Sequence, residues 1–170
     1  MDSLEQGQGI VVQIAKNFKE IDLRLPKLKK LVIDICGRFR LSKAMVSIAI
    51  VGNAEIRKVN GQFLGHDCTT DCLSFDLSDG EEEFENRPER LAKCFELVVN
   101  GEKALKEART RGHSSEAELA LYITHALLHN FGFDDCTGEQ AKKMHQTEDE
   151  ILQQHGYGSV YNTDNGQQDT

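Results

Sequence analysis

Two histidines, His125 and His129, stand four residues apart in an apolar stretch of the chain. On an α-helix this spacing places both imidazole rings on one face, one turn apart. Gly132 offers the left-handed conformation that ends many helices, so the chain can turn back and carry the carboxylate of Asp134 or Asp135 to the histidine face. Two nitrogens and one oxygen form a three-ligand set for zinc, with a fourth position left for water. A lone histidine on an apolar helix is usually a core residue, but this pair with its Gly and acid favours a metal site.

A metalloprotease is the first chemistry to weigh for such a site. The histidine pair, a Gly three residues on and an acid three beyond that match the ligand spacing of the metzincins. Those enzymes place a Glu directly after the first histidine, where it acts as general base. This chain has Ala126 there, which cannot take a proton, so the sequence argues against proteolysis by that mechanism.

Three segments match another family more closely, in order and in spacing. Residues 125–135 read His-Ala-Leu-Leu-His-Asn-Phe-Gly-Phe-Asp-Asp, against a family motif His-Gly-x-Leu-His-Leu-x-Gly-Tyr-Asp-His. Residues 69–75, Thr-Thr-Asp-Cys-Leu-Ser-Phe, are similar to the family's Pro-Thr-Asp-Val-Leu-Ser-Phe, and residues 144–152 are similar to its closing Met-x-x-x-Glu-x-x-Ile-Leu. Over residues 45–155 the chain therefore resembles the YbeY endoribonucleases, which are bacterial rRNA maturation factors.

The resemblance implies an α+β fold with one Zn²⁺ held by three histidines. By position, His125 and His129 are ligands, and the third family histidine falls on Asp135. A carboxylate can replace imidazole at zinc, but it makes the bound unit less positive and its water less acidic. A second departure is Leu64, which stands where the family carries an Arg thought to contact RNA or the transition state.

The sequence thus predicts a zinc-dependent, single-strand-specific endoribonuclease that acts in rRNA maturation and ribosome quality control through a metal-activated water. The expected partners are single-stranded RNA, in particular rRNA, and the ribosome or its assembly factors. The residues expected to contact RNA are Arg57, Lys58, His66, Asp71 and Ser74. The alternative is a non-catalytic ribosome- or RNA-associated module with a structural metal, which the loss of the family Arg favours.

Charge and composition set further limits. The net charge of −8 excludes a generally basic nucleic-acid coat, although nine basic residues between positions 16 and 43 face only three acidic ones. That excess can track a phosphate backbone or form a solvated helix face. The N-terminus lacks the basic-then-apolar order of a signal peptide and no apolar run has membrane-spanning length, which predicts a cytoplasmic protein without membrane contact. The five cysteines are then expected to be reduced.

The pattern of elements predicts an α+β domain over residues 1–156, a small mixed β-sheet packed against helices. A polar, disordered tail is expected over 157–170, and Val160 and Tyr161 can anchor its start. A central buried helix carries the metal ligands. A capping box of Ser115 and Glu118 is expected to begin this helix, and a second box of Thr137 and Gln140 the next one. The other expected elements are strands at 9–14, 45–51, 70–77 and 94–99, helices at 26–39, 54–63 (capped by Asn53) and 101–111, and a loop at 78–90. His145 and His155 are expected at the surface.

Overall fold

The computed structural model describes residues 9–65, 69–78, 92–158 and 160. Its sheet has four strands in the order β1-β2-β4-β3. Strands β1 and β4 run parallel to β2, whereas β3 runs antiparallel to β4 at the sheet edge. The bounds are Ile10–Lys16 (β1), Lys43–Val51 (β2), Cys72–Asp76 (β3) and Ala92–Asn100 (β4). The predicted mixed sheet of an α+β fold is confirmed.

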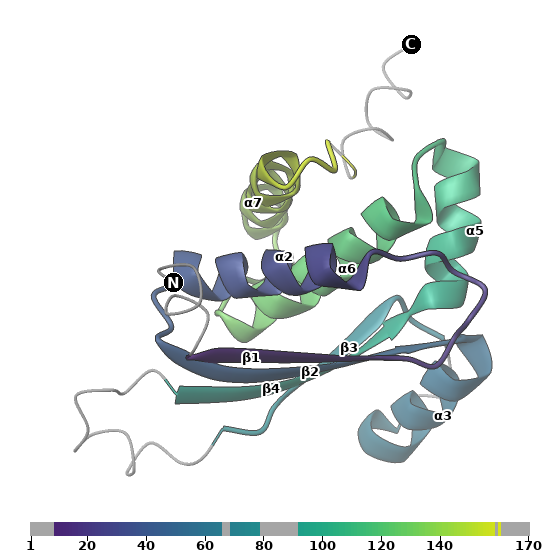
Figure 1. Cartoon of the computed structure of the whole chain (residues 1–170), viewed down its shortest axis with the longest axis horizontal. Helices are drawn as coiled ribbons and strands as arrows, with labels where there is room; N and C mark the ends of the chain where they lie inside the picture. The colour runs from purple at the N-terminus through teal and green to yellow at the C-terminus, as the bar shows by residue number, and fades with distance from the viewer. Residues whose placement is uncertain (1–8, 66–68, 79–91, 159, 161–170) are drawn as a thin grey trace.

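Helices cover the two faces of this sheet unequally. Figure 1 shows α2, α6 and α7 above the sheet and α3 below it, with α5 at the right-hand end. The bounds are Leu25–Arg38 (α2), Asn53–Leu64 (α3), Gly101–Arg111 (α5), Ser115–Asn130 (α6) and Gly138–Gln154 (α7). None of the described helices is long and apolar enough to cross a membrane.

The main core lies between the sheet and helices α2, α6 and α7. Alternate residues of β2, among them Val46, Ile48 and Ile50, point into it, as the period-2 geometry of a strand requires. Residues Leu119 to Leu128 of α6 are buried with the exception of His125, so α6 is the central buried helix that the sequence predicts. A smaller cluster around Ile56 and Leu73 packs α3 on the opposite face.

Two predicted helix starts are wrong, each by one residue. Helix α6 begins after Ser114, whose Oγ accepts a hydrogen bond from the Ala117 N–H at 3.0 Å, and Glu118 contacts His113 and Arg111 instead of the helix end. Asn53 is not the cap of α3 but its first residue. The Thr137–Gln140 capping box of α7 is confirmed.

Asn53 has a different role from the one predicted. Its backbone N–H donates to Glu102 Oε1 at 2.9 Å, so a side chain from α5 satisfies one of the donors that a helix start leaves open. Its own side-chain oxygen accepts from Asn100 Nδ2 at 2.7 Å. The start of α3 is therefore held by the end of β4 and the start of α5.

Several predicted features fall at or beyond the described residues. The loop expected at 78–90 lies outside them from residue 79 onward. Tyr157 and Val160, assigned from sequence to the polar tail, pack against the main core, and Val160 is 1% exposed. The described cysteines Cys36, Cys72, Cys94 and Cys136 are free thiols.

A buried carboxylate joins the start of α6 to two distant segments. Glu116, 5% exposed, accepts hydrogen bonds from the backbone N–H and the guanidinium of Arg24 and, at 2.7 Å, from the Tyr157 hydroxyl. Burial raises the pKa of Glu116, but the hydrogen bonds from Arg24 and Tyr157 outweigh it and hold the pKa below its usual range. The charged form of Glu116 therefore stabilises the fold.

Replacing Glu116 by Gln removes this charge and keeps the shape. We expect the free energy of unfolding at neutral pH to fall by about 1–3 kcal/mol, because hydrogen bonds to a charged group are lost. Since the folded-state pKa lies below the unfolded value, the stabilisation is present above the unfolded pKa and disappears as the pH falls through the folded one. Denaturant unfolding should show a difference between wild type and variant that narrows in acid.

Glu139→Gln is the matched control for Glu116→Gln. Glu139 occupies the second position of α7, as Glu116 does in α6, but it is exposed. Equal destabilisation by both substitutions would assign the effect to the helix dipole and contradict the role of the Arg24–Tyr157 contacts.

Candidate metal centre

The two histidines of α6 converge on one point, as their spacing predicts. The Nε2 atoms of His125 and His129 lie 3.1 Å apart, and the rings meet edge to face. Both side chains are partly exposed, at 21% and 34%, on a helix that is otherwise buried along this stretch. The two rings are therefore partly open to solvent although their helix is packed in the core.

The chain turns sharply after α6 and returns to this point. Gly132 has a φ of +95°, in the left-handed region that favours glycine. Its N–H donates to the His129 carbonyl at 3.1 Å, and the Phe133 N–H donates to the Leu128 carbonyl at 2.9 Å. This pair of bonds is the Schellman motif, and it carries the residues after Phe133 back toward the histidine face.

The returning carboxylate is that of Asp135. Its Oδ2 lies 3.8 Å from His125 Nε2 and 3.9 Å from His129 Nε2. A circle through three atoms separated by 3.1, 3.8 and 3.9 Å has a radius of about 2.1 Å, the length of zinc bonds to imidazole nitrogen and carboxylate oxygen. The three side chains can therefore hold one metal ion, and their donor set fits zinc.

The neighbouring Asp134 serves the turn instead. Its Oδ1 accepts hydrogen bonds from the Asp135 N–H at 2.8 Å and from the Cys136 thiol at 3.1 Å. These bonds, that of Cys136 first, lower the pKa of Asp134. Of the two acids between which the sequence did not decide, the structure brings Asp135 to the histidine pair.

Each histidine is oriented through its other nitrogen. His129 Nδ1 lies 3.1 Å from the carbonyl oxygen of Phe133, and His125 Nδ1 lies 2.8 Å from Glu148 Oε2 on α7. Burial lowers the pKa of His125, but the hydrogen bond and charge of Glu148 outweigh it, so the pKa is raised. In the metal-free protein, protons therefore compete with a cation for His125 as the pH falls.

A cavity of about 230 Å³ opens beside His125, between α5, α6 and α7. Two cationic side chains, Lys103 and Arg111, line it together with Asp71 and Tyr122. The Tyr122 hydroxyl is buried, and burial, followed by the neighbouring Glu118 carboxylate, raises its pKa. The cavity thus combines charged groups with a hydroxyl that a ligand can contact.

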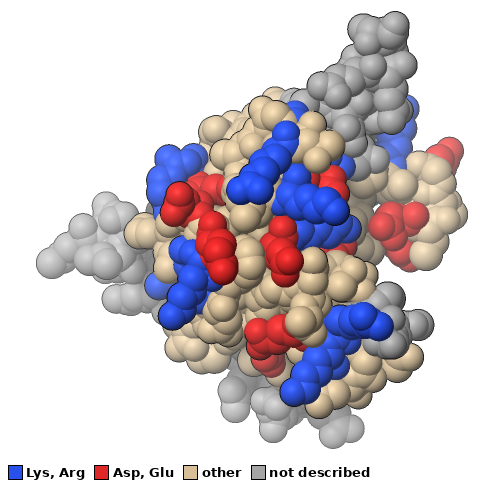
Figure 2. All heavy atoms as spheres, turned by 90° about the vertical axis from the view of Figure 1, so that its right-hand side faces the viewer, with Lys and Arg blue, Asp and Glu red and all other residues tan. Residues whose placement is uncertain are grey.

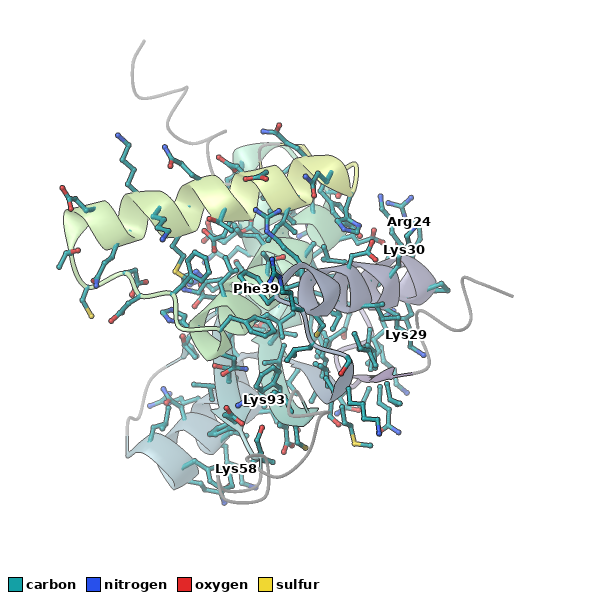
Figure 3. The ribbon with its side chains drawn as sticks, turned by 90° about the vertical axis from the view of Figure 1, so that its left-hand side faces the viewer. Arg24, Lys29, Lys30, Phe39, Lys58 and Lys93 are labelled. Atoms are coloured by element: carbon teal, nitrogen blue, oxygen red, sulfur yellow. The ribbon has the colours of Figure 1, made fainter. Side chains whose placement is uncertain are left out.

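The structure brings only part of the predicted RNA-contacting set to this place. Asp71 lines the cavity, whereas Arg57 and Lys58 are exposed on α3 and Ser74 is partly buried on β3, outside the described cavity wall. Figure 3 places Lys58 at the opposite end of the molecule from α7. His66 lies outside the described residues.

The basic segment between residues 16 and 43 does not border the histidines either. In Figure 3, Lys29 and Lys30 of α2 point outward on the side away from the loop that joins α6 to α7. Figure 2 shows the end of the molecule where α5 lies in Figure 1, and there too basic and acidic side chains are interspersed. The surface of α2 that is described here therefore fits a solvated helix face better than a track leading to the metal ligands.

Sequence reasoning missed several residues of this centre. Glu148 and the cavity cations Lys103 and Arg111 went unremarked, since their helices showed no sign of packing near the histidines. His145, expected at the surface, is partly exposed, but its Nδ1 lies 2.7 Å from Glu148 Oε1 and it lines the cavity. His155 is also largely buried, 3.4 Å from Asp34. The position of Glu148 within the 144–152 segment was the one available signal.

Residues 12–156 match the model of the family described as Endoribonuclease YbeY. The chain belongs to the YbeY endoribonuclease family. The protein of that name from Thermoanaerobacter sp. is 38% identical over 144 residues, which cover 81% of this chain and 87% of the relative. Its namesake from Macrococcus caseolyticus is 30% identical over 149 residues, covering 86% and 96%.

A solved structure agrees with this assignment at the level of the fold. The solution structure of a Thermotoga maritima protein aligns with a TM-score of 0.57 at 23% identity, covering 86% of this chain and 88% of that one. The match to the YbeY model begins within β1. The similarity to the family therefore starts well before residue 45, the first residue of the resemblance found in the sequence. As a YbeY protein the chain is an endonuclease and a metal-dependent hydrolase, and the family implies a role in rRNA maturation.

The two adjacent acids give a direct test of the ligand set. We expect Asp135→Asn to weaken zinc binding by at least about tenfold, whereas Asp134→Asn changes it little. Calorimetric titration of the metal-free proteins with zinc measures both. The assignment fails if Asp134→Asn weakens binding as much as Asp135→Asn does.

Proposed function

We propose that this chain is a zinc-dependent, single-strand-specific endoribonuclease acting in rRNA maturation and ribosome quality control. The observation that carries the proposal is the convergence of His125, His129 and Asp135 on one point beside a cavity. Three ligands leave a coordination position open, as in catalytic zinc sites, whereas structural zinc sites use four protein ligands. Family membership supplies the substrate class.

The side chains of the chain set up this chemistry. When bound, zinc would lower the pKa of water and polarise a phosphoryl oxygen. His125 and His129 would each hold the ion through Nε2, because Nδ1 already contacts Glu148 in one ring and the Phe133 carbonyl in the other. Asp135 lowers the net charge of the site by one relative to three histidines. A bound water would then be less acidic, so we expect cleavage to be favoured at a higher pH.

The cavity constrains how RNA can bind. Four carboxylates, those of Asp71, Glu107, Glu118 and Glu148, line it against one Lys and one Arg, and Arg111 lies 3.5 Å from Glu118. A phosphate deep inside would meet net negative charge. We therefore place a base or ribose in the cavity and the scissile phosphate at its mouth, next to the metal ligands.

The partners and compartment follow from the same proposal. Single-stranded rRNA, presented by the ribosome or its assembly factors in the cytoplasm, is the expected substrate. Because Leu64 is 49% exposed and neutral, the cation that the family places there is missing. RNA binding then relies on the metal ion and on cations such as Lys103.

Cleavage of a labelled single-stranded rRNA fragment tests the activity. We expect cleavage by the zinc-loaded protein, loss of cleavage with a chelator, recovery on adding zinc back, and loss in His125→Ala. His155→Ala, prepared identically, is the matched control, because His155 lies against Asp34 away from the metal ligands. Equal cleavage by His125→Ala would trace the activity to a contaminating nuclease, and RNA binding without cleavage would support the non-catalytic module.

Restoring the family cation gives a second test. Leu64→Arg should bind single-stranded RNA more tightly and steepen the dependence of log affinity on log salt by about 0.7, the value for one additional phosphate contact. Gln62→Arg, an exposed position on the same helix, controls for added charge alone. Filter binding over a salt series measures both, and equal gains in the two variants would contradict a specific role for position 64.

A further inference from the structure

Glu148 is a charged residue buried completely between two histidines. Its side chain is 1% exposed, and it reaches from α7 toward the histidine face of α6. One carboxylate oxygen lies 2.8 Å from His125 Nδ1, and the other lies 2.7 Å from His145 Nδ1. A buried carboxylate needs such partners, and here two imidazoles supply one each.

These two contacts favour one placement of the ring protons. A carboxylate accepts hydrogen bonds and cannot donate them, so it pairs with rings that carry a proton on Nδ1. A neutral imidazole that carries its proton on Nδ1 has its lone pair on Nε2. For His125 that Nε2 is the atom 3.1 Å from His129 Nε2 and 3.8 Å from Asp135 Oδ2.

We propose that Glu148 is the positioning residue of the metal centre. Its carboxylate fixes the tautomer and the ring orientation of His125, and His145 holds that carboxylate in place by occupying its second oxygen. This inference rests on the proposed metal site. It adds two residues of α7 that act on the metal through His125.

The role assigned to His145 follows from burial. Without it, the second oxygen of a fully buried carboxylate would lose its partner, and the group could rotate away from His125. With both oxygens engaged, the plane of the carboxylate is set by two rings from two helices. The lone pair of His125 is then aimed before any ion arrives.

Glu148→Gln changes this arrangement in a defined way. An amide has one accepting oxygen and one donating nitrogen, so it can accept from only one of the two rings. The other ring faces the amide N–H of the Gln, so its Nδ1 has to accept a hydrogen bond and its proton has to move to Nε2. Either this reversal or the lost charge weakens His125 as a ligand, and we expect zinc affinity to fall about 10–100-fold.

A second substitution should reverse part of that loss. In Glu148→Gln/His145→Ala the amide oxygen is free to turn to His125, while its nitrogen faces the space that His145 left. We therefore expect the double variant to bind zinc more tightly than Glu148→Gln alone. A merely structural role predicts the opposite sign, because the second truncation would add to the damage.

Zinc affinity is measured by competition with a chromophoric chelator, on variants whose circular dichroism matches wild type. Glu150→Gln, exposed and two residues further along α7, is the matched control and should leave the affinity unchanged. Unchanged affinity in folded Glu148→Gln, or a double variant weaker than the single one, would overturn the role of Glu148.

The ring tautomers of the metal-free protein give an independent measurement. Nitrogen-15 chemical shifts are recorded at a pH where both rings are neutral, and the His125 signals are assigned by their loss in His125→Ala. We expect the shifts to show Nδ1–H in both His125 and His145. Nε2–H in wild-type His125 would overturn the inference even if Glu148→Gln fails to fold. If both rings carry Nδ1–H but the wild-type protein binds no zinc, the proposed metal site is refuted, and with it the role of Glu148 toward the metal.

Discussion

The centre depends on one constraint: each imidazole must donate from Nδ1 so that both Nε2 atoms can face the same point. His129 meets it locally, through the Phe133 carbonyl in the turn that follows its own helix. His125 meets it through a carboxylate from another helix. One half of the site is therefore built by a single turn, and the other half requires α7 to dock on α6.

Other contacts of the fold hold α6 and α7 in place. Helix α6 is buried against the sheet, so the histidines project from a base that cannot shift easily. Residues following α7 are attached to the start of α6 by the Tyr157–Glu116 hydrogen bond, and the turn before α7 packs Phe133 beside Phe39. Helix α7 is thus tied to the start of α6 after its C-terminal end and to the end of α2 before its N-terminal end, with Glu148 between these two contacts.

The sequence predicted the elements with strong periodic signals and the part of the site that is contiguous in the chain. The His125 spacing, Gly132 and the returning acid lie within eleven residues, so local geometry was enough. The start of α6 was misplaced by one residue because Ser114 and Ser115 are equally good caps, and Glu118 matched the box for the wrong one. Only packing revealed that Glu118 contacts His113 and Arg111.

Residues supplied by distant elements could not be predicted in this way. Glu148 belongs to a helix rich in acidic and polar residues, and its place in the 144–152 segment was the one sign that sets it apart from the solvated carboxylates of that helix. The same holds for Lys103 and Arg111 on α5, whose place beside His125 depends on how α5 and α6 pack. Long-range pairing decides such positions, and a single sequence carries no record of it.

Asp135 differs from the two histidines in its surroundings. Its side chain is 43% exposed, on a turn, whereas His125 and His129 rise from a stretch whose neighbours are all buried. A substitution at position 135 exchanges the donor atom and the charge offered to the ion without repacking the interior. In the proposed site, Asp135 is therefore the ligand whose donor atom and charge one substitution can change, while the helix that carries the two histidines stays under the constraints of the core.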